Sequence, residues 1–337
     1  VTMTGEGGAM MDPLPPNDHY FAVIVCVEDN QANWNDVSLV YNTLTQEYGY
    51  KKENIFVHYS FSGTSPQYGN DLDGSPYSND IDYPATHPAI NATFYELAGV
   101  YNNDPDIPEL GHDDLLSVFF TDVPVDEENP VNWAFWFDNQ GEYVLVQVNS
   151  SVTANKLAGI DCAQMLLTFS INSGETIAEP FMDFTNPVDC ENRYVHTATS
   201  EDEDKHFEQY ITGGNYSEYL FYWAAAARGF YPASPYTEPW TTGYAQGSFP
   251  FSTIPGLEDH DPDYIPDWSQ DNIAQMGEAF HYANDQNTWS WYGYHKEDLE
   301  HPLYWDLNPF MQETGNPPDV VSLAGYAGDI SFTAQIT

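Results

Sequence analysis

Two loops carry enough carboxylate and amide side chains to bind a hard cation. The first interleaves Asp and Asn with Gly, and its candidate ligands are Asp71, Asp73, Asp80 and Asp82. The second contributes the candidates Asp261 and Asp263. Calcium takes six to eight oxygen ligands, so either loop could hold Ca²⁺ or another divalent ion. Neither has the spacing of an EF-hand, and prolines interrupt the second, so solvated turn carboxylates are the alternative.

Three cysteines, Cys26, Cys162 and Cys190, are the other side chains with distinctive chemistry. Their spacing matches no zinc site. Cys26 lies inside the apolar run 21–27, so we expect it to be a small buried residue.

The elements that must position these residues follow an alternating pattern. Continuous apolar runs are typical of parallel strands buried on both faces, and helical periods lie between them. Strands are expected at 21–27, 54–59, 115–121, 163–171 and 193–198, and helices at 34–48, 88–101, 152–160, 216–228 and 272–283. Segments 133–137 and 143–148 flank Asp-Asn-Gln-Gly and predict a β-hairpin. The fold class is therefore α/β, a mostly parallel sheet with helices on both faces and a hairpin insertion.

The pattern divides the chain into three parts. Residues 1–18 are rich in Gly, Met and Pro and are expected to form a tail. Residues 19–229 form the α/β domain. Residues 230–337 are rich in Pro, Trp, Tyr and Asp, and are expected to form an extension packed on the main domain by aromatic contacts.

Several segments resemble one peptidase family in the same order along the chain. Residues 49–57 read GYKKENIFV, residues 73–75 read DGS, residues 79–82 read NDID, and residues 172–174 read NSG. These are similar to motifs of the caspase-like cysteine peptidases of the legumain and gingipain kind, in their secreted bacterial and archaeal versions. The resemblance implies a caspase-like sheet over residues 19–229, with a His and a Cys after neighbouring parallel strands.

Both members of that dyad are missing. The family's histidine turn reads FTGHG, whereas residues 120–124 read FTDVP, which puts Val123 at the histidine position. The nucleophile turn reads CxSG, whereas Ile171 precedes the vestigial turn Asn172, Ser173 and Gly174. Val and Ile side chains neither transfer protons nor attack carbonyls, so the resemblance implies a pseudo-peptidase.

Other serines and histidines are weak substitutes for the lost dyad. Ser170 lies one position earlier on its strand and should point to the opposite face. Ser173 is expected to be a turn residue, and His196 a buried strand residue. His112 and His206 lie elsewhere in the sequence. An active Ser/His replacement remains a minor alternative.

The resemblance also suggests a disulfide. Cys162 and Cys190 each precede a strand, and in the family these two strands are parallel neighbours. Their amino ends would lie side by side, at a separation that a disulfide between Cys162 and Cys190 could span.

Composition restricts the partners of this chain. It has 52 acidic residues against 7 Lys and Arg, and a formal net charge of -45. Such a chain should repel nucleic acid and anionic lipid and attract cations. No apolar stretch is long enough to span a membrane. The acidic run 201–204 is expected to be a solvated face.

An extracellular or cell-surface location fits several features. The sequence begins at Val1 without an initiator Met, which is typical of a processed secreted protein. Sequons at Asn91, Asn149 and Asn215 would permit glycosylation.

Three functions remain open from the sequence. The first is a structural subunit of an extracellular layer, sheath or filament that assembles with itself or with other surface proteins. The second is a module that binds peptides without cutting them. The third is a peptidase with an unrecognised nucleophile.

Overall fold

The structure, a computed structural model, describes most of the first 200 residues and short segments beyond them. The described residues are 15–65, 69–73, 79–126, 128–139, 142–182, 192–200, 204–207, 216–228, 279–280, 283 and 303–306. Within these ranges, no helix has both the length and the apolar character needed to cross a bilayer.

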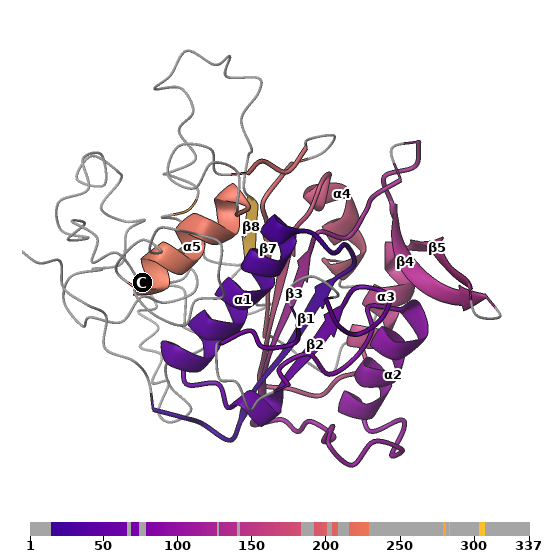
Figure 1. The fold of residues 1–337 in the computed structure, drawn as a ribbon. Coiled ribbons are helices and arrows are strands. Elements are labelled where there is room, and N and C mark those ends of the chain that lie inside the picture. Colours follow the sequence, from indigo (N-terminus) through magenta and orange to yellow (C-terminus); the bar gives the residue numbers. More distant parts are fainter. Residues whose placement is uncertain are drawn as a thin grey trace, which may run out of the picture.

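A six-stranded sheet forms the centre of the molecule, in the order β2-β1-β3-β6-β7-β8 (Figure 1). The first five strands are parallel, and β8 pairs antiparallel with β7. Every residue of β1, β3 and β6 is buried, as expected of apolar runs covered on both faces. The strands are β1 (Tyr20–Cys26), β2 (Ile55–Tyr59), β3 (Leu115–Thr121), β6 (Gln164–Ser170), β7 (Asn192–Thr197) and β8 (Leu303–Asp306).

Helices cover both faces of this sheet. Alternate residues of β1 belong to two separate apolar clusters, because successive strand side chains point to opposite faces. One cluster contains α1 (Gln31–Gln46) and α5 (Glu218–Arg228), and the other contains α2 (His87–Leu97), α3 (Ser150–Leu157) and α4 (Gly174–Ala178). The predicted fold class, a mostly parallel sheet between two helical layers, is therefore confirmed (Figure 1).

The predicted hairpin is also confirmed. Strands β4 (Asn132–Asn139) and β5 (Glu142–Asn149) pair antiparallel and form a sheet of their own. Trp133 and Phe135 bury the base of the hairpin against the α2/α3 side of the core. The residues toward the turn are exposed, so the hairpin projects from the body of the protein (Figure 1).

Strand β8 was not predicted. It lies in the segment that we expected to be an extension, and it joins the central sheet beside β7. Four residues are too few to show an alternating pattern, so only the pairing with β7 reveals this strand. Of the helix expected at 272–283, only positions 279, 280 and 283 are described, and they are helical.

Candidate functional site

The two positions that the resemblance assigns to a dyad lie at one edge of the sheet. Thr121, the last residue of β3, pairs with Ser170, the last residue of β6. Ile171 directly follows β6 and Val123 lies two residues after β3, at the carboxyl ends of the strands, where open α/β sheets place their sites. Both side chains are buried in the same apolar cluster. Neither side chain can transfer a proton or act as a nucleophile, and the assignment of a former dyad to these positions stays a prediction.

The vestigial turn after β6 is closely packed against the end of β7. Ser173 has a left-handed backbone (φ 48°). The Gly174 N–H donates to Thr199 Oγ1 (2.7 Å), whose hydroxyl donates to the Ile171 carbonyl (2.8 Å). A Cβ at Gly174 would lie 3.0 Å from Thr199 Oγ1, so a larger residue would require Thr199 to shift. The turn therefore packs closely against the residues that follow β7.

A buried lysine lies against this edge. The Lys205 N–H donates to Asn172 Oδ1 (2.8 Å), and Lys205 Nζ hydrogen-bonds to Asp122 Oδ1. Nζ also lies 3.8 Å from Asp36 Oδ2, a carboxylate of α1. The side chains of Lys205, Asp122 and Asp36 are 4%, 6% and 0% exposed. An ammonium group thus lies between two buried carboxylates at this edge of the sheet.

Asp36 connects this ion cluster to the start of α5. Its Oδ1 accepts the Ser217 N–H (2.9 Å), and its Oδ2 accepts the Ser217 hydroxyl. Burial raises the pKa of Asp36 to about 7, although Lys205 and Ser217 favour the ionised form. For Lys205, burial opposes the charged form, but Asp122 and Asp36 outweigh it and the pKa is raised. The lysine therefore stays protonated, and Asp36 titrates near neutral pH.

Cys26 ends the neighbouring strand β1 and is fully buried, as predicted. Its thiol donates to the Glu28 carbonyl (3.3 Å). Burial, reinforced by Asp122 and Asp36, raises its pKa well above the ordinary value. Since the thiolate is the nucleophilic form, burial disfavours reactivity of this cysteine.

Two of the alternative bases, His112 and His196, lie in different parts of the fold. His112 lies 3.5 Å from Asp161 at the amino ends of the strands, the opposite edge from Ser173. His196 is buried within β7 and packs against Phe280, with ring centroids 4.9 Å apart. Ser170 is buried at the end of β6.

The sequence missed the Lys205 cluster. Lys205 directly follows the acidic run 201–204, for which a solvated face is expected. Asp204 is indeed exposed, and residues 201–203 lie outside the described residues, but Lys205 is buried. The rarity of lysine in this chain was the one available signal.

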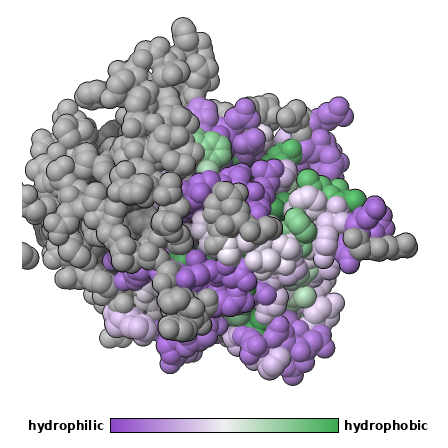
Figure 2. Space-filling model, in the orientation of Figure 1, coloured by the Kyte–Doolittle hydropathy of each residue, from purple (hydrophilic) through white to green (hydrophobic). Residues whose placement is uncertain are grey.

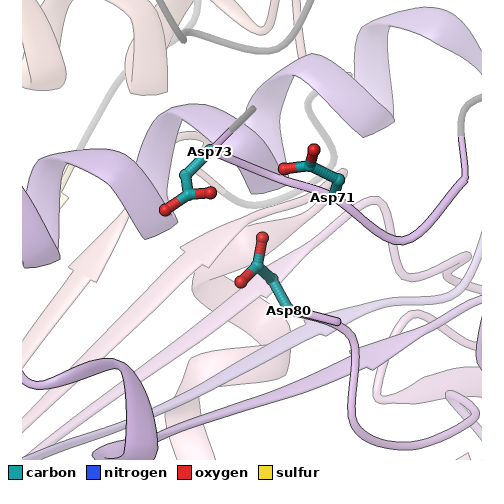
Figure 3. Close-up of side chains that lie close together, drawn as sticks. All are labelled: Asp71, Asp73 and Asp80. Carbon is teal, nitrogen blue, oxygen red and sulfur yellow. The ribbon is translucent and has the colours of Figure 1, made fainter. Parts of the chain in front are cut away.

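Three of the four predicted cation ligands in the first loop lie together. Asp71, Asp73 and Asp80 each direct a carboxylate oxygen toward a shared space, and these oxygens lie within 4.8 Å of one another (Figure 3). Asp80 is buried, and its carboxylate accepts the Leu72 N–H (2.8 Å).

The fourth candidate of that loop lies apart from this cluster. The carboxylate of Asp82 accepts the Val57 N–H of β2 (2.8 Å) instead. Lys52 forms an ion pair with Asp73, so a cation would have to displace its ammonium group. The remaining triad supplies three of the six to eight oxygen ligands that Ca²⁺ takes, and a cation here stays a prediction. Asp261 and Asp263 lie outside the described residues.

The register of β6 and β7 bears on the expected disulfide. Gln164 pairs with Asn192, and the two cysteines each precede one of these residues by two positions. Cys162 is buried at the start of β6, whereas Cys190 lies outside the described residues. The disulfide stays a prediction.

Two of the three sequons are described. Asn149 is exposed at the end of β5, and its Oδ1 accepts the Ser151 N–H (3.0 Å) as the N-cap of α3. Asn91 lies on α2, with its amide beside the His87 ring (2.9 Å). Asn215 lies outside the described residues. Glycosylation at these positions stays a prediction.

Comparisons with known proteins give structural matches alone. No family model matches the chain, and no curated protein does. Caspase-1 from Spodoptera frugiperda is 9% identical, with a TM-score of 0.40 over 88% of this chain and 89% of that protein. Raptor from Chaetomium thermophilum is 9% identical, with a TM-score of 0.39 over 92% of this chain but 29% of Raptor. At such identities the matches concern the fold, and a caspase is among the similar structures.

Proposed function

We propose that this chain is a catalytically inactive caspase/legumain-like protein that acts outside the cell as a structural or cell-surface assembly subunit, in a layer, sheath or filament. The observation that carries the loss of catalysis is the buried Lys205–Asp122 pair at the carboxyl edge of β3 and β6. A peptidase of this fold needs a nucleophile and a base there. Val123 and Ile171 supply neither, and Lys205 fills the edge.

The same observation argues against the main alternative, a module that holds peptides in the old cleft. A peptide placed there would have to displace the Lys205 backbone from Asn172 and expose a buried ion pair. Breaking such a pair is costly, because it leaves an uncompensated charge. An assembly role makes no demand on this edge.

Composition and surface support the extracellular setting. With only 7 Lys and Arg, the chain offers few sites to trypsin-like proteases, which suits an exposed coat. The sequon residue Asn149 is exposed. A net charge of -45 requires screening or bound cations, and we propose Asp71, Asp73 and Asp80 as a site for calcium or another divalent ion.

Two measurements test this proposal. First, the purified protein is incubated with a peptide library and a thiol-directed covalent probe, and neither turnover nor labelling is expected. Turnover that Ser173→Ala or His196→Ala abolishes would contradict inactivity. Second, particle mass is followed by light scattering as protein and divalent cation concentrations rise. Growth with concentration is expected, and a monomer throughout would overturn the assembly role.

A further inference from the structure

The β4–β5 hairpin leaves several apolar side chains exposed, although Tyr143 also contacts Phe61, with ring centroids 5.1 Å apart. Val144, Leu145 and Val146 are 38%, 45% and 38% exposed, and Tyr143 and Phe137 are similarly accessible. Successive side chains of a strand point to opposite faces, so Val144 and Val146 lie on one face of the hairpin and Tyr143 and Leu145 on the other. In Figure 2 a hydrophobic patch appears where Figure 1 places the hairpin. Contiguous apolar exposure of this kind marks an interaction surface.

Strand β5 is also an edge. Its described pairing is with β4 on one side, and the described part of the chain supplies no strand on the other. An exposed, flat, apolar edge strand is a template for pairing with another strand. Its partner would gain main-chain hydrogen bonds as well as apolar contact on both faces.

Charge indicates which partner fits. The chain has 52 acidic residues, but after Glu142, the first residue of β5, the next one is Asp161. The rest of β5 and all of α3 therefore carry no carboxylate side chain. Two molecules of net charge -45 repel wherever their acidic surfaces approach. The β5 edge is a surface where two copies can meet without opposing carboxylates. The projection of the hairpin keeps the two bodies apart, and physiological salt screens charges beyond ~8 Å.

The sequence of β5 is compatible with its own antiparallel copy. With a two-fold axis through Leu145, this residue lies opposite Leu145 of the second copy. Val144 then faces Val146, Tyr143 faces Gln147, and Glu142 faces Val148 rather than a second glutamate. Aromatic and β-branched cross-strand pairs are stabilising, and no like charges are opposed.

We propose that β5 pairs antiparallel with β5 of a second copy of this chain, forming a four-stranded β4-β5-β5-β4 sheet across a two-fold axis. This inference rests on the proposed role as an assembling subunit. A two-fold contact closes into a dimer, so the dimer would be the unit from which a larger layer or filament is built.

The first experiment compares three full-length proteins by light scattering over a range of concentrations: the native protein, Leu145→Glu and Val100→Glu. Val100 is the matched control, because it is 62% exposed and outside the hairpin. We expect Leu145→Glu to raise the concentration for half-dimerisation on the order of tenfold or more, and Val100→Glu to leave it unchanged. Circular dichroism checks that both variants are folded.

A second experiment detects the register. In the double variant Val144→Cys/Val146→Cys, each new thiol faces one of the second copy across the axis, and mild oxidation should give a covalent dimer. Either single variant should give none, because its two thiols would be two positions out of register.

The outcomes separate the two proposals. A native protein that stays monomeric overturns the assembly role and this inference with it. A native protein that assembles, with Leu145→Glu assembling equally and no cross-linked dimer, overturns the β5 surface and leaves the assembly role standing.

Discussion

At the scale of single residues, Lys205 provides the buried positive charge at the carboxyl edge of the sheet. It is the one described cation placed between Asp36 and Asp122. Buried carboxylates are tolerated when they are paired, and burial without a partner costs several kcal/mol. We therefore expect the stability of the protein to depend on this lysine.

Replacing the lysine should be strongly destabilising. We expect Lys205→Met to lower the free energy of unfolding by about 3–5 kcal/mol, because it leaves two buried carboxylates without their counterion. Lys51→Met is the control, since Lys51 pairs with the exposed Asp18 and its loss should change the free energy of unfolding far less. Urea denaturation of both variants measures the difference. Equal losses of unfolding free energy would show that the buried ion pairs of Lys205 stabilise the protein no more than an exposed pair does.

Asp36 should make stability depend on pH. Its pKa is raised to about 7 in the folded protein, against about 3.9 when unfolded. Between these values the unfolded chain releases a proton that the folded protein keeps. The contribution of Asp36 to the free energy of unfolding is therefore greatest below about pH 4 and is lost as the pH rises toward 7.

The variant Asp36→Asn isolates this effect. Between about pH 4 and pH 8, the free energy of unfolding of the native protein should fall by a few kcal/mol relative to that of the variant. Denaturant titrations across this range measure it. The exposed Asp204→Asn should show no such trend. A difference independent of pH would mean that Asp36 does not titrate there.

At the scale of elements, neighbouring strands with a fixed register set which side chains can meet. Parallel β6 and β7 pair Gln164 with Asn192. Both expected disulfide partners lie two positions before this pair, so the register is consistent with a bond between them.

The disulfide is tested by counting thiols in the denatured, unreduced protein. We expect one reactive thiol, that of Cys26, because Cys162 and Cys190 are bonded. Reduction, or the pair Cys162→Ser/Cys190→Ser, should lower stability by ~2–4 kcal/mol through the loss of loop closure. Three reactive thiols before reduction would refute the bond.

At the scale of the whole molecule, net charge governs how the protein responds to salt. Repulsion among carboxylates in a chain of net charge -45 acts over ~30 Å at 0.01 M salt and over ~8 Å at physiological strength. Monovalent salt screens it everywhere, whereas a specific ion stabilises the fold by mass action at one site.

A specific site should be visible as a divalent effect at constant ionic strength. Added Ca²⁺ should raise the melting temperature above its value in chelator. At a Ca²⁺ concentration 100 times the dissociation constant, the free energy of unfolding should rise by roughly 2.7 kcal/mol. Asp71→Asn should remove this effect, and the exposed Asp113→Asn should keep it. If NaCl at matched ionic strength reproduces the whole effect, only screening remains.

The sequence by itself determined most of the elements. Continuous apolar runs are typical of strands covered on both faces, so the five parallel strands, the longer helices and the hairpin were predicted, whereas the short helix α4 was not. The identities of Val123 and Ile171 state directly that no thiol or imidazole stands at those positions.

Tertiary structure alone decided what replaces that chemistry. Asp36, Asp122 and Lys205 are far apart in sequence and meet only because α1, the end of β3 and the segment 204–207 converge on one edge. Asp82 lies apart from the Asp80 cluster because its carboxylate accepts a hydrogen bond from the Val57 N–H. Strand β8 is defined by its antiparallel pairing with β7. Burial and hydrogen bonding between distant segments carry no local period, so the linear sequence does not display them.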